Sequence, residues 1–176
     1  MSFIYRLFLA FNSTFLIVVV FLVKEKYYIA FLESLGIYFS WGIFVAVPIV
    51  LTAFSFLIAS KLTPDNLSSA SIEEIELANN NFLPTYLGYF FVSLGVNDVP
   101  TLIIVFVIIY VFTFLSQTLY FNPIFLLFGY HFYFVKTTKK VKLFLITKKM
   151  LKVPGKEGFD ELRRINDYTF LEIKKK

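Results

Sequence analysis

Long runs of uncharged, apolar residues constrain this chain more than any other feature of its sequence. The run Thr101–Leu115 contains no charged residue, and 58% of the 176 residues are hydrophobic. The mean hydropathy of the chain is +0.74. A helix needs about 20 consecutive apolar residues to cross the hydrocarbon core of a bilayer. The sequence therefore predicts an α-helical integral membrane protein.

Four stretches are predicted to be transmembrane helices. The first follows Arg6 as the apolar part of a signal peptide would, but no A-x-A-like cleavage site comes after it, so we expect an uncleaved span. The third is the weakest, because Phe82–Val96 is too short to cross alone and needs the polar stretch Leu77–Asn81. Three spans, with Phe82–Val96 re-entrant or lying flat, are the alternative. The predicted spans cover residues 7–23, 36–59, 79–96 and 101–120.

The polar loop 60–78 lies between the second and third predicted spans. Ser71 is a candidate N-cap, acidic residues follow it, and apolar residues are spaced among them. This pattern is typical of a helix start and predicts a short helix over Ser71–Leu77, outside the bilayer. Residues 1–121 as a whole form the predicted four-span membrane domain.

Residues 122–176 are predicted to form a small, basic, cytoplasmic α+β domain rich in β-hairpin. Asn122-Pro123 ends the helical pattern, because the residue before proline disfavours the α conformation. Period-two alternation then predicts a hairpin, and a domain this small is expected to lean on the bilayer, on copies of itself or on a partner. The hairpin strands are predicted over Tyr130–Val135 and Val141–Lys148, one or two helical turns over Phe159–Ile165, and a further strand over Tyr168–Ile173.

The basic residues concentrate in the last quarter of the chain. From Lys136 to Lys176 there are 13 Lys and Arg against five Asp and Glu. The positive-inside rule therefore places this tail in the cytoplasm, and four spans place the N-terminus and loop 60–78 on the same side. The tail would also attract anionic lipid. Direct nucleic-acid binding is not expected, because acidic residues interrupt Lys156–Arg164 and no recognition motif is present.

The sequence predicts no enzyme, no metal site and no cofactor. The chain has no cysteine and a single histidine, His131, for which a structural role is expected. The common phosphate-binding, dinucleotide-binding, zinc-binding and nucleophile-elbow motifs are missing. No charged residue lies in the cores of the predicted spans, which disfavours ion-coupled transport and leaves a passive permease open.

Two sets of residues are candidates for protein contacts. Acidic residues of the loop and basic residues of the tail are predicted to dock a partner, with a solvated face as the ordinary alternative for the acidic run. Polar and kink-forming residues within the spans are predicted to pack helices, with a pore lining as the alternative. The docking set is Glu73, Glu74, Glu76, Lys139, Lys140, Lys142, Arg163 and Arg164, and the packing set is Asn12, Ser13, Thr14, Pro48 and Thr113.

Three segments carry a resemblance to a known family: NNFLPTYLGYFFVSLG, NPIFLLFGYHFYFVKT and KLFLITKK. They are similar to the membrane subunit of the bacterial Kiwa anti-phage defence system, the KwaA family. The resemblance implies an inner-membrane protein that assembles as a homo-oligomer, such as a tetramer, and senses phage attack at the envelope. It further implies a soluble cytoplasmic DNA-binding effector as partner, and it implies no catalytic residue.

Two functions of different classes are compatible with these expectations. The first is a non-enzymatic membrane scaffold and sensor that recruits the effector to the inner membrane. The second is a pore-forming membrane effector that depolarises infected cells.

Overall fold

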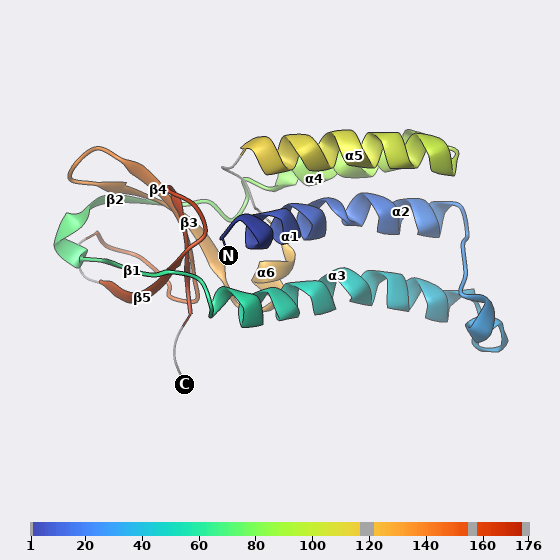
Figure 1. The fold of residues 1–176 in the computed structure, drawn as a ribbon, viewed down its shortest axis with the longest axis horizontal. Helices are drawn as coiled ribbons and strands as arrows, with labels where there is room; N and C mark the ends of the chain where they lie inside the picture. Colours follow the sequence, from blue (N-terminus) through green and yellow to red (C-terminus); the bar gives the residue numbers. More distant parts are fainter. Residues whose placement is uncertain (1, 117–121, 155–157, 174–176) are drawn as a thin grey trace.

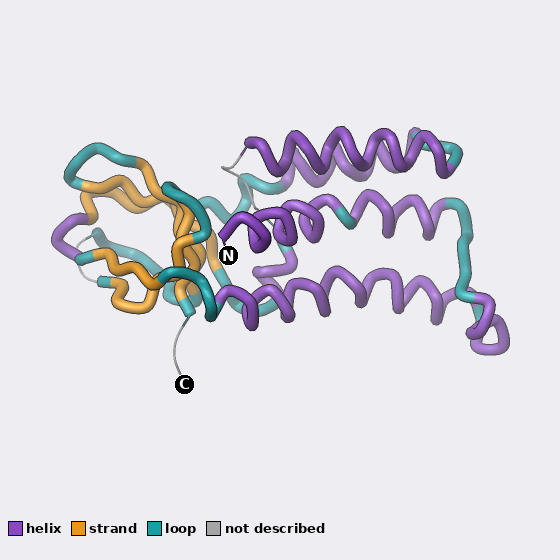
Figure 2. The backbone as a smooth tube through the Cα atoms, viewed as in Figure 1, coloured by secondary structure: helices purple, strands orange, loops and turns teal. Residues whose placement is uncertain are grey.

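The computed structural model describes residues 2–116, 122–154 and 158–173. The apolar helices lie side by side in one half of the molecule, and a β-sheet forms the other half (Figures 1 and 2). The chain enters the sheet twice, once between the third and fourth long helices and once after the last one. The sheet therefore contains strands from both predicted segments of the chain, 1–121 and 122–176.

The helical half is an up-and-down bundle whose helices run between the sheet end and the far end (Figure 1). The first two helices follow one axis and are separated only at Phe15. A short 3₁₀ helix, η1, and then α3 follow at the far end. The bounds are α1 Ser2–Thr14, α2 Leu16–Lys24, η1 Ala30–Leu35, α3 Ile37–Ala59, α4 Leu83–Gly95 and α5 Val99–Ser116.

Three helical stretches of the described chain are long and apolar enough to cross a membrane: Phe3–Lys24, Ile37–Ala59 and Val99–Ser116. These lie where three of the four spans are predicted, although residues 117–120 of the last predicted span lie outside the described residues. The remaining predicted span, 79–96, contains α4, which has only 13 residues. Such a helix is about 20 Å long, whereas the hydrocarbon core is about 30 Å thick. Helix length therefore does not establish a fourth crossing.

The sheet has six strands in the order β1-β5-β6-β4-β3-β2, and all neighbours are antiparallel except β4 and β6. Both edge strands come from loop 60–78, and the 3₁₀ helix η2 (Ser69–Ser71) connects them, so that the sheet curls (Figure 1). The predicted hairpin and the predicted last strand are confirmed as β3–β4 and β6. The strands are β1 Pro64–Leu67, β2 Ile72–Leu77, β3 His131–Thr137, β4 Lys142–Thr147, β5 Phe159–Arg164 and β6 Thr169–Glu172.

Two predicted helices are wrong, and both segments are strands. Ser71–Leu77 contains β2, and Phe159–Ile165 contains β5. Apolar residues three positions apart suggested helices, but each strand carries one extra residue relative to its partner, as a β-bulge does. The bulge turns residues at i and i+3 toward the same core. Ile72 with Ile75, and Phe159 with Leu162, accordingly contact one apolar cluster inside the curled sheet.

An aromatic joint attaches the other face of the sheet to the end of the bundle. We use this name for Phe56, Phe125, Tyr130, Phe132 and Phe144. Phe56 of α3 stacks on Tyr130 with ring centroids 4.7 Å apart and meets Phe125 edge-on at 5.1 Å. Phe125 belongs to the short helix α6 (Ile124–Leu127) and is fully buried. Phe132 and Phe144 continue the joint into β3 and β4 with stacked rings at 5.8 Å.

A buried polar contact connects α1, α3 and the segment before α6. Thr52 Oγ1 accepts hydrogen bonds from Asn12 Nδ2 at 2.7 Å and from Asn122 Nδ2 at 3.0 Å. The same hydroxyl donates to the carbonyl oxygen of Pro48 at 2.8 Å. All four residues are buried. The hydroxyl of Thr52 thus accepts hydrogen bonds from two amide groups inside the helical bundle, where water is not expected to replace the hydroxyl as their acceptor.

Replacement of Thr52 by valine tests this contact, because valine keeps the side-chain shape and leaves both amides without their acceptor. The Thr52→Val variant is expected to lose about 1–2 kcal/mol in the free energy of unfolding. Denaturant titration of the full chain in detergent measures this loss. Ser60→Ala is the matched control, since the exposed Ser60 hydroxyl only donates to its own helix at Leu57 O. Equal stability of the two variants would contradict the proposed importance of the contact.

Candidate functional site

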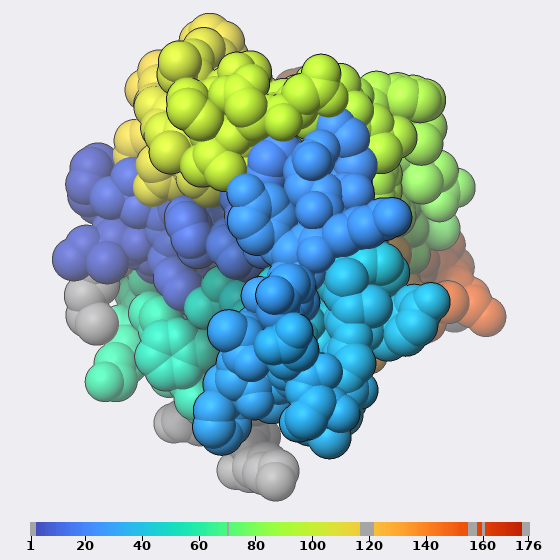
Figure 3. Space-filling view, turned by 90° about the vertical axis from the view of Figure 1, so that its right-hand side faces the viewer, coloured from blue at the N-terminus to red at the C-terminus, as the bar shows by residue number. Residues whose placement is uncertain are grey.

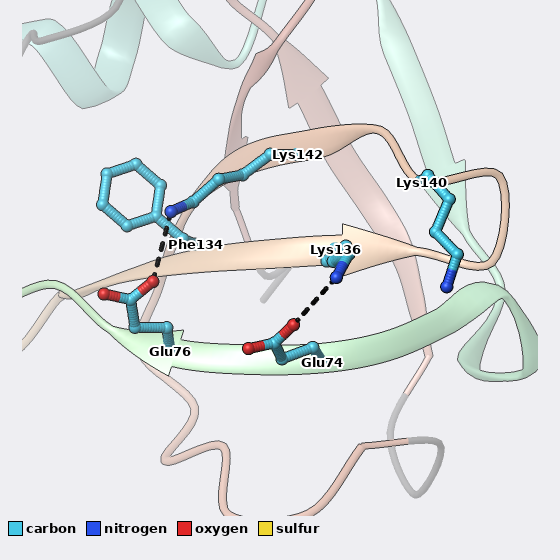
Figure 4. Close-up of a pocket in the computed structure, with 6 residues that line it drawn as sticks. All are labelled: Glu74, Glu76, Phe134, Lys136, Lys140 and Lys142. Atoms are coloured by element: carbon cyan, nitrogen blue, oxygen red, sulfur yellow. Dashed lines mark hydrogen bonds and ion pairs between the residues drawn. The ribbon is translucent and has the colours of Figure 1, made fainter.

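Three ion pairs lie on the surface of the sheet where β2, β3 and β4 are neighbours, and Figure 4 shows two of them, Glu74–Lys136 and Glu76–Lys142. Lys136 Nζ lies 3.3 Å from Glu74 Oε2, and Lys142 Nζ lies 3.2 Å from Glu76 Oε2. Lys140, in the hairpin turn, pairs with Glu73. All six side chains are exposed by a third or more. We call this surface the ion-pair face: Glu73, Glu74, Glu76, Lys136, Lys140 and Lys142.

Strand register places these charges opposite one another. Glu74 is paired with Lys136 in the β2–β3 ladder, and Lys136 is paired with Lys142 in the β3–β4 ladder. Between them lies Phe134, whose ring centroid is 4.1 Å from Lys142 Nζ. These residues, together with Glu76 and Lys140, line a hollow of about 260 Å³. The face therefore combines a row of carboxylates, a row of ammonium groups and an aromatic floor.

The three ion pairs of this face are open to solvent. The hydrogen bond from Lys140, with a further contribution from the positive charges of Lys140 and Lys136, holds the pKa of Glu73 below its usual value. Exposed pairs of this kind contribute little to folding, because solvent screens them and the long side chains lose entropy. A protein with complementary charges could replace the internal pairs at small cost. The three ion pairs therefore contribute little to holding the sheet together.

The structure brings most of the predicted docking set together and separates the rest. Lys139 is exposed in the same hairpin turn as Lys140. Arg163 and Arg164 lie on β5, next to the opposite edge of the sheet. Arg164 Nη2 pairs with Asp65 Oδ2 at 2.9 Å, and Arg163 Nη1 donates to the carbonyl oxygen of Leu62 at 3.1 Å. The two arginines therefore do not belong to the ion-pair face.

The other predicted packing residues form two kinds of contact. Thr113 Oγ1 lies 3.2 Å from the Tyr89 hydroxyl and so connects α5 with α4. The hydroxyls of Ser13 and Thr14 instead donate to the carbonyl oxygen of Ala10 in their own helix, at 3.0 and 2.9 Å. Such back-bonding satisfies hydroxyls inside a helix without reaching a neighbour.

Two features of the sheet were not anticipated from the sequence. A carboxylate, Glu172, is buried, receives a hydrogen bond from Thr147 and pairs with Lys149 Nζ at 3.0 Å. A second cavity, of about 250 Å³, lies inside the curled sheet. Neither has a local sequence signal, because both depend on strands far apart in the chain. Asp65, Asn66, Leu67, Val135, Leu143, Leu145, Leu162, Arg164, Asp167 and Phe170 line this cavity.

His131 and the acidic residues offer no metal centre in the described part of the chain. No group of three or more His, Asp or Glu side chains there is placed to hold an ion. His131 Nδ1 lies 3.0 Å from Asn79 Nδ2, and Asn79 Oδ1 accepts a hydrogen bond from the backbone N–H of Phe132 at 2.8 Å. This contact connects the loop that precedes α4 with the start of β3.

The lowered pKa of Glu73 predicts a pH-dependent contribution to stability. A carboxyl group whose pKa is lower in the folded than in the unfolded state stabilises the fold above its unfolded pKa, about 4.3, and loses this effect as pH falls through the folded pKa. The melting temperature of Glu73→Gln is therefore expected to lie slightly below that of the unsubstituted protein at pH 7, with the difference vanishing in acid. In a Lys140→Gln background the substitution should have little effect at any pH. An undiminished effect in that background would exclude Lys140 as the main cause.

Comparison with known proteins identifies the family. A family model described as anti-phage protein KwaA matches residues 5–171, which include the long helices and all six strands. No curated protein and no solved structure matches the chain. Because the match covers nearly the whole chain, the protein belongs to the family of the anti-phage protein KwaA and has a role in anti-phage defence.

Proposed function

We propose that this protein is the non-enzymatic membrane scaffold and sensor of a Kiwa-type defence complex, and that it recruits a soluble, DNA-binding effector to the inner membrane. The observation that carries the proposal is the ion-pair face, an exposed and balanced set of charges on a sheet fixed to a bundle of membrane-length helices. The effector is an expectation from the Kiwa resemblance. Assembly as a homo-oligomer belongs to the same proposal.

The proposed topology has four crossings, with both termini and the sheet in the cytoplasm. Fifteen of the 17 Lys and Arg residues then lie on the cytoplasmic side, and only Lys24 and Lys26 lie outside. The course of α4 supports a fourth crossing, since it runs along α5 from the sheet end to the far end (Figure 1). At the far end Lys24 Nζ donates to the carbonyl oxygen of Val96 at 2.6 Å and to Asn97 Oδ1 at 2.9 Å. These contacts fix the turn between α4 and α5 beside the end of α2.

The alternative function is a pore that depolarises infected cells. This alternative is favoured by polar side chains at membrane depth, such as Asn12, Thr52 and Asn122. Their amide and hydroxyl groups bond to one another, however, and so serve helix packing. Rapid loss of membrane potential on expression of the chain alone would favour the pore over the scaffold.

Exchange of charges within the ion-pair face tests the docking role while keeping the pairs. The variant exchanges Glu and Lys within each pair: Glu73 with Lys140, Glu74 with Lys136, and Glu76 with Lys142. The net charge and therefore the positive-inside bias stay unchanged. We expect the variant to reach the membrane at normal levels but to recover the effector at least about tenfold less in pull-downs through an N-terminal tag, the loss expected when about 1.4 kcal/mol of binding is removed.

The matched control is the exchange of Asp65 with Arg164, a single ion pair beside the opposite edge of the sheet. This variant should recover the effector as well as the unsubstituted protein does. Equal recovery by the threefold exchange and the unsubstituted protein would refute docking at the ion-pair face.

A further inference from the structure

The connection between α2 and α3 lies at the end of the bundle opposite the sheet (Figures 1 and 3), and several of its exposed side chains are aromatic. We call residues 25–36 the outer loop. Phe31, in η1, is 91% exposed, and Tyr27, Tyr28 and Leu35 are each exposed by more than 40%. A soluble loop rarely presents so much apolar surface without a partner. The surface continues into the exposed apolar side chains of α3, such as Tyr38 and Phe39.

Aromatic residues with a polar atom surround the outer loop, as expected where a protein meets lipid headgroups. Trp41, the only tryptophan of the chain, donates from Nε1 to the carbonyl oxygen of Tyr27 at 3.2 Å. Its ring also meets that of Tyr38 edge-on, with centroids 5.4 Å apart. Tryptophan and tyrosine concentrate at the membrane–water interface because one end of the ring system is apolar and the other is polar. The outer loop thus fits the headgroup region of the bilayer.

A hollow of about 230 Å³ in this loop is lined by Tyr28, Glu33, Gly36 and Ile37. Gly36 has φ +86° and ψ 159°, a conformation that side chains with a Cβ avoid, so it permits the sharp turn that closes the hollow. Glu33 has no ion pair among the described residues. Lys24 Nζ pairs with Glu25 Oε1 at 3.1 Å, and Lys26, the other lysine near the outer loop, forms no ion pair with Glu33 among the described residues.

We propose that this hollow binds the ammonium headgroup of a zwitterionic phospholipid of the phosphatidylethanolamine class. The Glu33 carboxylate would face the ammonium group, the Tyr28 ring would form a cation–π wall, and Phe31 would enter the apolar layer beside the acyl chains. The small size of the hollow suits a headgroup rather than a folded protein. The proposal rests on the membrane-spanning arrangement proposed above, but it does not depend on the docking of an effector.

Energy transfer from the single tryptophan tests the proposal directly. The full chain is reconstituted in vesicles of phosphatidylethanolamine and phosphatidylglycerol that contain a trace of one pyrene-labelled lipid, either the ethanolamine or the glycerol form. For the unsubstituted protein, transfer from Trp41 to the ethanolamine probe is expected to exceed transfer to the glycerol probe about threefold. In Glu33→Gln the two probes should give equal transfer, and Tyr28→Leu should reduce the preference.

Glu25→Gln is the matched control, since it removes one carboxylate from the same end of the bundle but not from the hollow. This variant should keep the preference for the ethanolamine probe. Equal transfer to both probes in the unsubstituted protein, or an unchanged preference in Glu33→Gln, would overturn the headgroup site. Transfer to neither probe would show that the outer loop lies away from lipid and would overturn the proposal together with the crossing of α2 and α3. Effector recovery in pull-downs should be unaffected by Glu33→Gln, which separates this proposal from the docking proposal.

Discussion

The aromatic joint, in which the ring of Phe56 packs on Phe125 and Tyr130, is the contact on which the arrangement of this protein depends. It packs the end of a membrane-length helix onto one face of the sheet. Aromatic pairs of this geometry gain from ring electrostatics as well as from the burial of apolar area. The sheet is therefore held against the bundle, and the ion-pair face keeps a fixed position relative to the membrane helices.

The surfaces at the two ends of the bundle differ in their charged and aromatic residues. At the sheet end, lysines outnumber acidic residues, and many of them form exposed ion pairs. At the far end there are few charges, and many of the exposed side chains are tyrosine and phenylalanine. This asymmetry agrees with the proposed docking of a soluble partner at the sheet end and the proposed contact with lipid headgroups at the far end.

The sequence was sufficient to predict the apolar helices and the β3–β4 hairpin, because each has a local period. It was not sufficient for β2 and β5. Their apolar residues, such as Ile72 and Ile75, follow the spacing of a helix, and only the bulges formed against their neighbouring strands turn them to one side. The same limit applies to the docking set: which charges lie together depends on strand order, so Arg164 could not be separated from Lys142 in advance.

Cysteine labelling of intact cells tests the membrane arrangement most directly, because the chain has no cysteine of its own. Single substitutions Ser69→Cys, between the edge strands, and Lys139→Cys, in the hairpin turn, should react with a membrane-impermeant maleimide only after the inner membrane is opened. Ser34→Cys, in the outer loop, should react once the outer membrane alone is permeabilised. Reaction of Lys139→Cys under that milder condition, or reaction of Ser69→Cys and Lys139→Cys from opposite sides, would contradict a sheet on the cytoplasmic side.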